Sequence, residues 1–379
     1  VFHGAMIILF FSFISIPYNA VIVSNEKMNL FAYLSISDVL LKLSIVYLLR
    51  ALPFDPLKTY SALLVCTGMM NFLLHKYLAT RICKEARLSL KVKISYIRRL
   101  LGFSCWNLVG SLAGICRNQG INILQNLYFG PIYNTACSIS FQIYNAINGF
   151  ASNFMMAANP QIIKLYAKGE KTALTLLVER SSKISFSLLA LITFPFLVFM
   201  PYILSLWLGD IPPVTVVFAR LILINMLIEC VSMPLMTLAQ ATGYVKYYQL
   251  FVGGILILNI PIAWLLLKYF HAEAFSTFAT LIAINVIALV CRLFILKRIA
   301  QLNITQFFKN VLTRWMIWIF LLLLYLVGLC LSIDCGLTAQ IIISCIFTFI
   351  AIPLVVLFVV FGKSERNIIK LYIKQKIKK

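Results

Sequence analysis

Long apolar runs separated by short polar connections cover almost the whole chain. A run of about 20 mostly apolar residues is long enough to cross a bilayer as a helix. The pattern predicts an all-α polytopic membrane protein with eleven membrane-spanning helices. We expect these helices at residues 5–23, 32–49, 60–79, 98–127, 131–156, 182–207, 213–238, 248–270, 273–295, 312–332 and 338–361.

Composition agrees with this class, since 62% of the 379 residues are hydrophobic and only 12% are charged. Lysine and arginine are concentrated in every second connection and in the tail, which together hold 27 of the 33 basic residues. Basic connections of membrane proteins lie on the cytoplasmic side. We therefore expect a cytoplasmic C-terminus, and the net charge of +22 needs no nucleic-acid partner to account for it.

The same orientation places the start of the first apolar run outside the cell. An odd number of spans would then precede Val1 in a protein whose true N-terminus is cytoplasmic. We therefore expect the chain to be a fragment that lacks its first helices.

Short external connections and the absence of catalytic motifs favour transport over catalysis. The sequence contains no GxxxxGK[ST] nucleotide-binding loop, no CxxC and no cysteine–histidine cluster. No paired carboxylates stand at an external membrane edge. We therefore expect no enzyme activity, no cofactor and no bound metal.

The predicted helix 98–127 carries a line of polar and small residues along one face. These residues recur every three or four positions, which places them on one side of an α-helix. Arg117 and Gln119 flank the line, and Asn126 lies closer to it. The residues in the line are Asn107, Ser111, Gly114, Asn118, Asn122 and Gln125.

The next predicted helix repeats the pattern, with Gln142 beside its stripe and Asn159-Pro160 as the expected helix end. Polar stripes facing lipid are costly, so both should face protein or water. Two full-length stripes on consecutive helices favour a hydrated cavity over amides that only join helices. The stripe residues of this second helix are Asn134, Ser138, Phe141, Asn145, Asn148 and Ser152.

Four further charges and Arg117 fall inside predicted spans. Asp38 and Lys42 stand four residues apart in the order that favours a salt bridge on a helix. Arg220 is close enough to the external end of its span for its side chain to extend to the membrane–water interface. Arg117 could also extend there instead of being buried. A buried Arg117 would need a partner or an anionic ligand. Glu229 lies near mid-span, where it is a candidate coupling site for a proton or cation, or the partner of an unidentified cation.

The sequence also resembles the Wzx-type polysaccharide flippases of bacteria, which belong to the superfamily of the MATE drug exporters and the lipid II flippase. The resemblance is carried by four segments in order, which together extend over most of the chain. These are IPYNAVIVSNEKMNLFAYLSISDVLLKLSIVYLL (16–49), RNQGINILQNLYFGPIYNTACSISFQIYNAINGFASNFMMAANPQIIKLYAKGE (117–170), LSLWLGDIPPVTVVFARLILIN and PLMTLAQATGYVKYYQ.

This resemblance implies a 14-helix architecture with two six-helix lobes around a central cavity, followed by two extra helices. Residues 1–90 would be the end of the N-lobe, 91–300 the C-lobe, and 301–379 the extra pair with a basic tail. The two polar-striped helices would line the cavity. The family moves undecaprenyl-pyrophosphate-linked oligosaccharides across the bacterial inner membrane for surface polysaccharides such as O-antigen.

The implied partners are this lipid-linked cargo, membrane lipids, a polysaccharide polymerase and a chain-length regulator. Amides of the stripes would bind sugar hydroxyls, and cations would neutralise the pyrophosphate. Aromatic side chains such as Trp106, Tyr128, Phe141 and Tyr144 are candidates for stacking on sugar rings. Two alternatives stay open, a MATE-like exporter of small organic cations and a non-transporting scaffold of a glycan-assembly complex.

Overall fold

The computed structural model describes residues 2–51, 55–82, 94–313 and 320. Every regular element among these residues is a helix. Eight of the helices are long and apolar enough to cross a bilayer, so the chain is an all-α polytopic membrane protein. These candidate spans are Phe2–Ser24, Met28–Leu49, Leu57–Ile82, Leu100–Phe129, Lys171–Leu208, Val214–Ala241, Val245–Tyr269 and Ser276–Ile299.

The chain divides into two compact units, Val1–Ile97 and Arg98–Lys379. The first unit contains α1 (Phe2–Ser24), α2 (Met28–Ala51) and α3 (Pro56–Ile82). The predicted helices 312–332 and 338–361 lie almost wholly outside the described residues. The predicted division into lobes stays a prediction.

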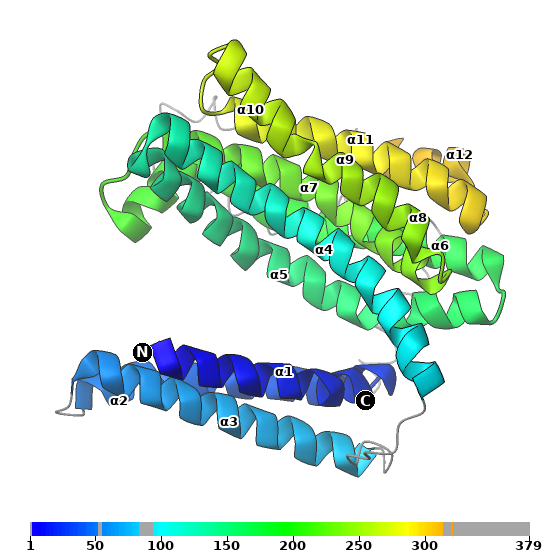
Figure 1. Cartoon of the computed structure of the whole chain (residues 1–379), viewed down its shortest axis with the longest axis horizontal. Coiled ribbons are helices and arrows are strands. Elements are labelled where there is room, and N and C mark those ends of the chain that lie inside the picture. The colour runs from blue at the N-terminus through cyan, green and yellow to red at the C-terminus, as the bar shows by residue number, and fades with distance from the viewer. Residues whose placement is uncertain (1, 52–54, 83–93, 314–319, 321–379) are drawn as a thin grey trace. The chain divides into compact units, whose positions relative to one another are not determined.

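The second unit holds the remaining helices, which Figure 1 shows in cyan to orange. Its long helices are α4 (Ile94–Phe129, which begins just before the unit), α5 (Pro131–Ala167), α6 (Lys171–Leu208), α7 (Val214–Ala241) and α11 (Ser276–Ile299). One predicted span is built from several pieces, namely α8 (Val245–Tyr248), the π-helix η2 (Gln249–Gly253), α9 (Gly254–Ile257) and α10 (Asn259–Tyr269). The short α12 (Ile304–Phe307) and the π-helix η3 (Phe308–Leu312) follow α11.

Helix α5 corrects one expectation, because Asn159-Pro160 does not end it. The helix runs through Pro160 to Ala167. A proline inside a membrane helix removes one backbone hydrogen bond, which neighbouring helices can compensate. Here the Thr237 hydroxyl of α7 donates to Asn159 Oδ1 at 2.7 Å, which ties α5 to its neighbour at this point.

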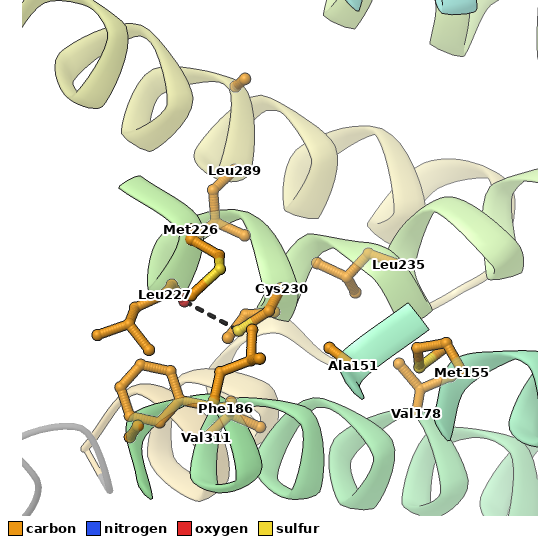
Figure 2. Close-up of a cluster of buried hydrophobic side chains, with 14 of the residues drawn as sticks. Ala151, Met155, Val178, Phe186, Met226, Leu227, Cys230, Leu235, Leu289 and Val311 are labelled. Carbon is orange, nitrogen blue, oxygen red and sulfur yellow. Dashed lines mark hydrogen bonds between the residues drawn. The ribbon is translucent and has the colours of Figure 1, made fainter. Parts of the chain in front are cut away.

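Helix α7 lies at the centre of the second unit, packed against α5, α6 and α11. Figure 2 shows the contact region, where Ala151 of α5, Phe186 of α6 and Leu289 of α11 surround Met226 and Cys230 of α7. Lipid tails are as apolar as these side chains, so close van der Waals packing holds the helices together in the bilayer.

Helix α4 lies along α10, and two glycines permit its close approach. A Cβ atom added to Gly120 would lie 2.7 Å from Ile260 Cδ1, and one added to Gly110 would overlap the Gln249 amide. Leu124 of α4 packs nearby against Ala263 and Leu267 of α10. These contacts fix the face that α4 turns toward the rest of the unit.

Candidate functional site

The guanidinium of Arg117 is the centre of a buried polar network in the second unit. The residue is 4% exposed and lies well inside the candidate span Leu100–Phe129. Its Nη2 is 3.2 Å from Glu229 Oε1. Its Nη1 donates to Asn285 Oδ1 at 3.0 Å, and its Nε donates to Asn118 Oδ1 at 3.2 Å.

Glu229 receives hydrogen bonds on both carboxylate oxygens. While Oε1 binds Arg117, the Tyr144 hydroxyl of α5 donates to Oε2 at 3.0 Å. Asn225, one turn earlier on α7, donates to the same oxygen at 3.5 Å. The Glu229 side chain is 23% exposed although it lies near the middle of its span, so it is not completely buried.

A pair of asparagines closes the network, because Asn285 of α11 donates to Asn225 of α7. The network thus joins α4, α5, α7 and α11. A buried charge is tolerated in the bilayer interior only with such partners, and each additional hydrogen bond offsets desolvation. The Arg117–Glu229 ion pair and its hydrogen bonds therefore connect four helices.

These contacts decide between the alternatives for Arg117. The side chain is buried and paired, so the expectation that it extends to the membrane interface is wrong. One alternative for Glu229 was that it pairs with an unidentified cation. The structure identifies this cation as Arg117. The sequence alone could not join them, since 112 positions separate the two residues.

The stripe of α4 divides between two environments. Gln125 is fully buried and donates to Ala274 O at 2.8 Å and Thr277 Oγ1 at 2.6 Å, so its amide joins α4 to α11. Asn107 accepts hydrogen bonds from Gln240 and Gln249, both at 3.4 Å. The other stripe residues and their neighbours are partly or largely exposed, namely Ser111, Gly114, Asn118, Gln119, Asn122 and Asn126.

Gln125 and Asn107 are thus engaged in helix packing, and the expectation that Gln125 lies free along a cavity is wrong. Its position facing the first turn of α11 explains this. Asn118 and Asn122 are half-buried, and Asn122 Oδ1 has no hydrogen-bond partner. The Asn118 oxygen accepts from Arg117, so Asn122 is the half-buried amide of this stripe whose oxygen has no partner.

The stripe of α5 faces outward from the second unit. Ser138, Gln142, Asn145 and Ser152 are exposed, whereas Asn134, Phe141 and Asn148 are half-buried. The opposite face of α5 is apolar and buried, with Ile143, Ile147 and Ala151 in the core. The phenyl ring of Phe141 packs against Phe278, with ring centroids 6.3 Å apart.

The exposed faces of α10 and α11 are apolar, in contrast to that of α5. Leu258 and Leu265 flank the exposed face of α10, and Val286, Val290 and Phe294 form that of α11. Apolar faces suit lipid, whereas the amide-bearing face of α5 does not. This difference explains why α5, alone among the long helices described, is too polar to qualify as a span by hydropathy.

Arg220 has a structural role at α6, and its extension to the membrane interface stays a prediction. Pro201 lacks an N–H, so it leaves the carbonyl of Leu197 without its helical partner. Arg220 Nε donates to Leu197 O at 2.8 Å, and Nη2 lies 3.4 Å from Val198 O. The guanidinium therefore satisfies carbonyls at the kink of α6, which is centred on Phe199.

The predicted pair in the first unit is present, with Lys42 Nζ 2.7 Å from Asp38 Oδ2. Asn71 of α3 donates to the other oxygen, Oδ1, also at 2.7 Å. These residues and His75 line a cavity of about 370 Å³ between α1, α2 and α3. Both oxygens of Asp38 are thus engaged within this unit.

Arg292 is a buried charge that the sequence pattern did not single out, although it falls in the predicted helix 273–295. Helix α11 continues to Ile299, and Arg292 is only 7% exposed within it. Its Nε donates to the hydroxyl of Tyr248, 3.1 Å away, at the end of α8. Its seven-residue spacing from Asn285 was an available signal, because it places the two on one helix face.

No three His, Cys, Asp or Glu side chains in the described ranges lie close enough to hold a metal ion. The chain matches no family model, no curated protein and no solved structure.

Proposed function

We propose that this protein carries an undecaprenyl-pyrophosphate-linked oligosaccharide from the cytoplasmic to the outer leaflet of a bacterial inner membrane. Its C-terminus lies in the cytoplasm, as the basic connections predict. The observation that supports the proposal is the exposed amide face of α5, on a helix that is packed among apolar membrane helices.

Amides and hydroxyls on that face suit a hydroxyl-rich cargo. Gln142 and Asn145 each offer both hydrogen-bond donors and acceptors, as do the hydroxyl groups of a sugar. The face carries no charge between Pro131 and Gln161. A neutral glycan passing along it therefore meets groups that replace its hydration without holding it by charge.

We infer that the two-lobe rocking motion common to alternating-access transporters exposes this face to each side in turn. The Arg117–Glu229 network joins four helices, so its rearrangement would move them together. The driving force is either the consumption of glycan outside or ion coupling through Glu229 or Asp38.

The engaged carboxylates do not favour export of small organic cations. A cation exporter needs a free carboxylate to bind its cargo, but Glu229 is paired with Arg117 and Asp38 with Lys42. Drug-resistance measurements on cells expressing the gene distinguish a cation exporter from a flippase, because a flippase should confer no drug resistance.

The test is transport by the whole gene product in bacteria that lack their own flippase, with lipid-linked glycan reaching the periplasm as the readout. Replacing both Gln142 and Asn145 by leucine should lower transport at least about tenfold, since buried polar cargo groups then lose their partners. A matched control replaces the lipid-suited pair Val286 and Val290 by leucine.

Undiminished transport in the Gln142→Leu/Asn145→Leu variant would contradict the proposal. A scaffold predicts this same result, with glycan export lost only when the whole protein is removed.

A further inference from the structure

The second unit holds two buried arginines, on α4 and α11, and a carboxylate on α7, the helix against which α11 packs. Arg117 is 4% exposed and Arg292 is 7% exposed. Glu229 forms an ion pair with Arg117, and Arg292 lies on the neighbouring helix α11. The group of three side chains therefore carries a net positive charge inside the membrane-spanning part of the protein.

Arg292 is poorly satisfied in this arrangement. Its Nε has the Tyr248 hydroxyl as acceptor, but its Nη1 is buried without a hydrogen-bond partner. A buried guanidinium without an anion is costly, so the observed state leaves a site that a carboxylate would stabilise.

The register of α7 and α11 places Glu229 within reach of that site. The two helices lie side by side in the same direction, since Phe218 packs on Phe278 and Asn225 binds Asn285. Both contacts join residues 60 positions apart, so Arg292 of α11 lies level with Ser232 of α7 along the helix axes. Glu229 therefore lies about 4.5 Å from the level of Arg292 along the axis, at 1.5 Å per residue.

We propose that Glu229 exchanges between two partners, Arg117 and Arg292, and that its move to Arg292 frees Arg117 to bind a phosphate group of the cargo. This inference rests on the proposed function. It adds that Glu229 controls when the phosphate of the cargo can bind Arg117. The partly exposed Glu229 side chain is not locked by packing on every side.

Charge balance is the physical reason for the exchange. With no cargo present, one carboxylate serves two guanidinium groups. When a phosphate binds Arg117, Glu229 on Arg292 leaves each cation with an anion. Asn118 and Asn285, which now accept from Arg117, would hold its guanidinium in place while the phosphate approaches.

The experiment measures binding of undecaprenyl pyrophosphate to the whole gene product in detergent, by quenching of tryptophan fluorescence. Arg292→Gln removes the alternative partner, keeps Glu229 on Arg117, and should weaken binding about tenfold. Glu229→Gln removes the internal competitor and should tighten binding. The decisive variant is Glu229→Gln/Arg292→Gln, which should bind as tightly as Glu229→Gln alone.

Two further variants separate charge from folding. Arg292→Lys keeps the positive charge and should bind close to wild type. Lys297→Gln removes an exposed charge from the last turn of the same helix and should change nothing. Thermal unfolding of each variant in the same detergent checks that the protein is folded.

The inference is overturned if Arg292→Gln binds like wild type, or if its defect is equally large when Glu229 is already glutamine. Either result would leave the proposed cargo intact. Failure of wild type and every variant to bind the lipid overturns the inference and the proposed cargo together.

Discussion

Breaking the Arg117–Glu229 pair should have unequal consequences on its two sides. In Glu229→Gln the carboxylate is lost, which leaves Arg117 and Arg292 without a countercharge. Removing one partner of a buried pair costs about 3–5 kcal/mol. We expect about 3 kcal/mol of lost stability, near the lower limit, because glutamine keeps an oxygen that Arg117 and Tyr144 can bind.

Arg117→Gln should cost less, about 1–2 kcal/mol. The Glu229 side chain left behind keeps the Tyr144 and Asn225 donors and is partly exposed. The double variant should cost less than the sum of the single variants by about 2 kcal/mol, since neither charge is then left alone.

The assay is reversible unfolding of the whole gene product in mixed micelles with increasing SDS, followed by circular dichroism. The unfolding midpoints give the stability loss of each single variant. They also show by how much the loss in the double variant falls short of the sum of the two. A larger loss for Arg117→Gln than for Glu229→Gln, or strictly additive losses, would refute the assignment of Arg292 as an unpaired second cation.

Three further outcomes can be measured with the same unfolding assay. Tyr144→Phe removes a donor to a carboxylate and should cost about 1.5–3 kcal/mol, and an unchanged midpoint would contradict the observed hydrogen bond. Gly120→Ala should cost about 1–3 kcal/mol because its new Cβ meets a side chain of α10. At Gly114 an added Cβ has no atom within 4 Å, so Gly114→Ala should instead stabilise α4 by about 0.5–1 kcal/mol. Equal effects of the two alanines would disprove the close approach of α4 to α10 at Gly120. Arg220→Ala should cost about 1–2 kcal/mol, and the cost should shrink when Pro201→Ala restores the missing backbone donor, whereas an unchanged cost would show that Arg220 acts elsewhere.

Much of the helical architecture could be predicted from hydrophobic runs, because each span must satisfy its own backbone in the bilayer. Eight of the nine runs predicted in the described part of the chain are candidate spans, whereas the run 131–156 lies in α5, which is not one. Helix ends were less predictable. Pro160 was expected to end its helix, yet α5 continues past it, where the Thr237 hydroxyl of α7 binds Asn159.

The polar stripes were visible from helical spacing, but their surroundings were not. The α4 stripe turns partly inward, so Gln125 binds α11 and Asn107 binds the amides of α7 and η2. The α5 stripe turns outward. Periodicity reports which residues share a face, whereas the packing partners of that face depend on distant segments.

The sequence by itself determined that this is a helical membrane protein with charges and amides inside its spans, because hydropathy and the 3.6-residue period are local properties. Only the tertiary structure decided which charges meet. Arg117 of α4 and Glu229 of α7 are 112 positions apart in the chain and meet only in the folded unit, while Arg220 binds the carbonyls at the kink of α6. Ion pairing depends on distances between helices, and those distances are set by the packing of the whole bundle.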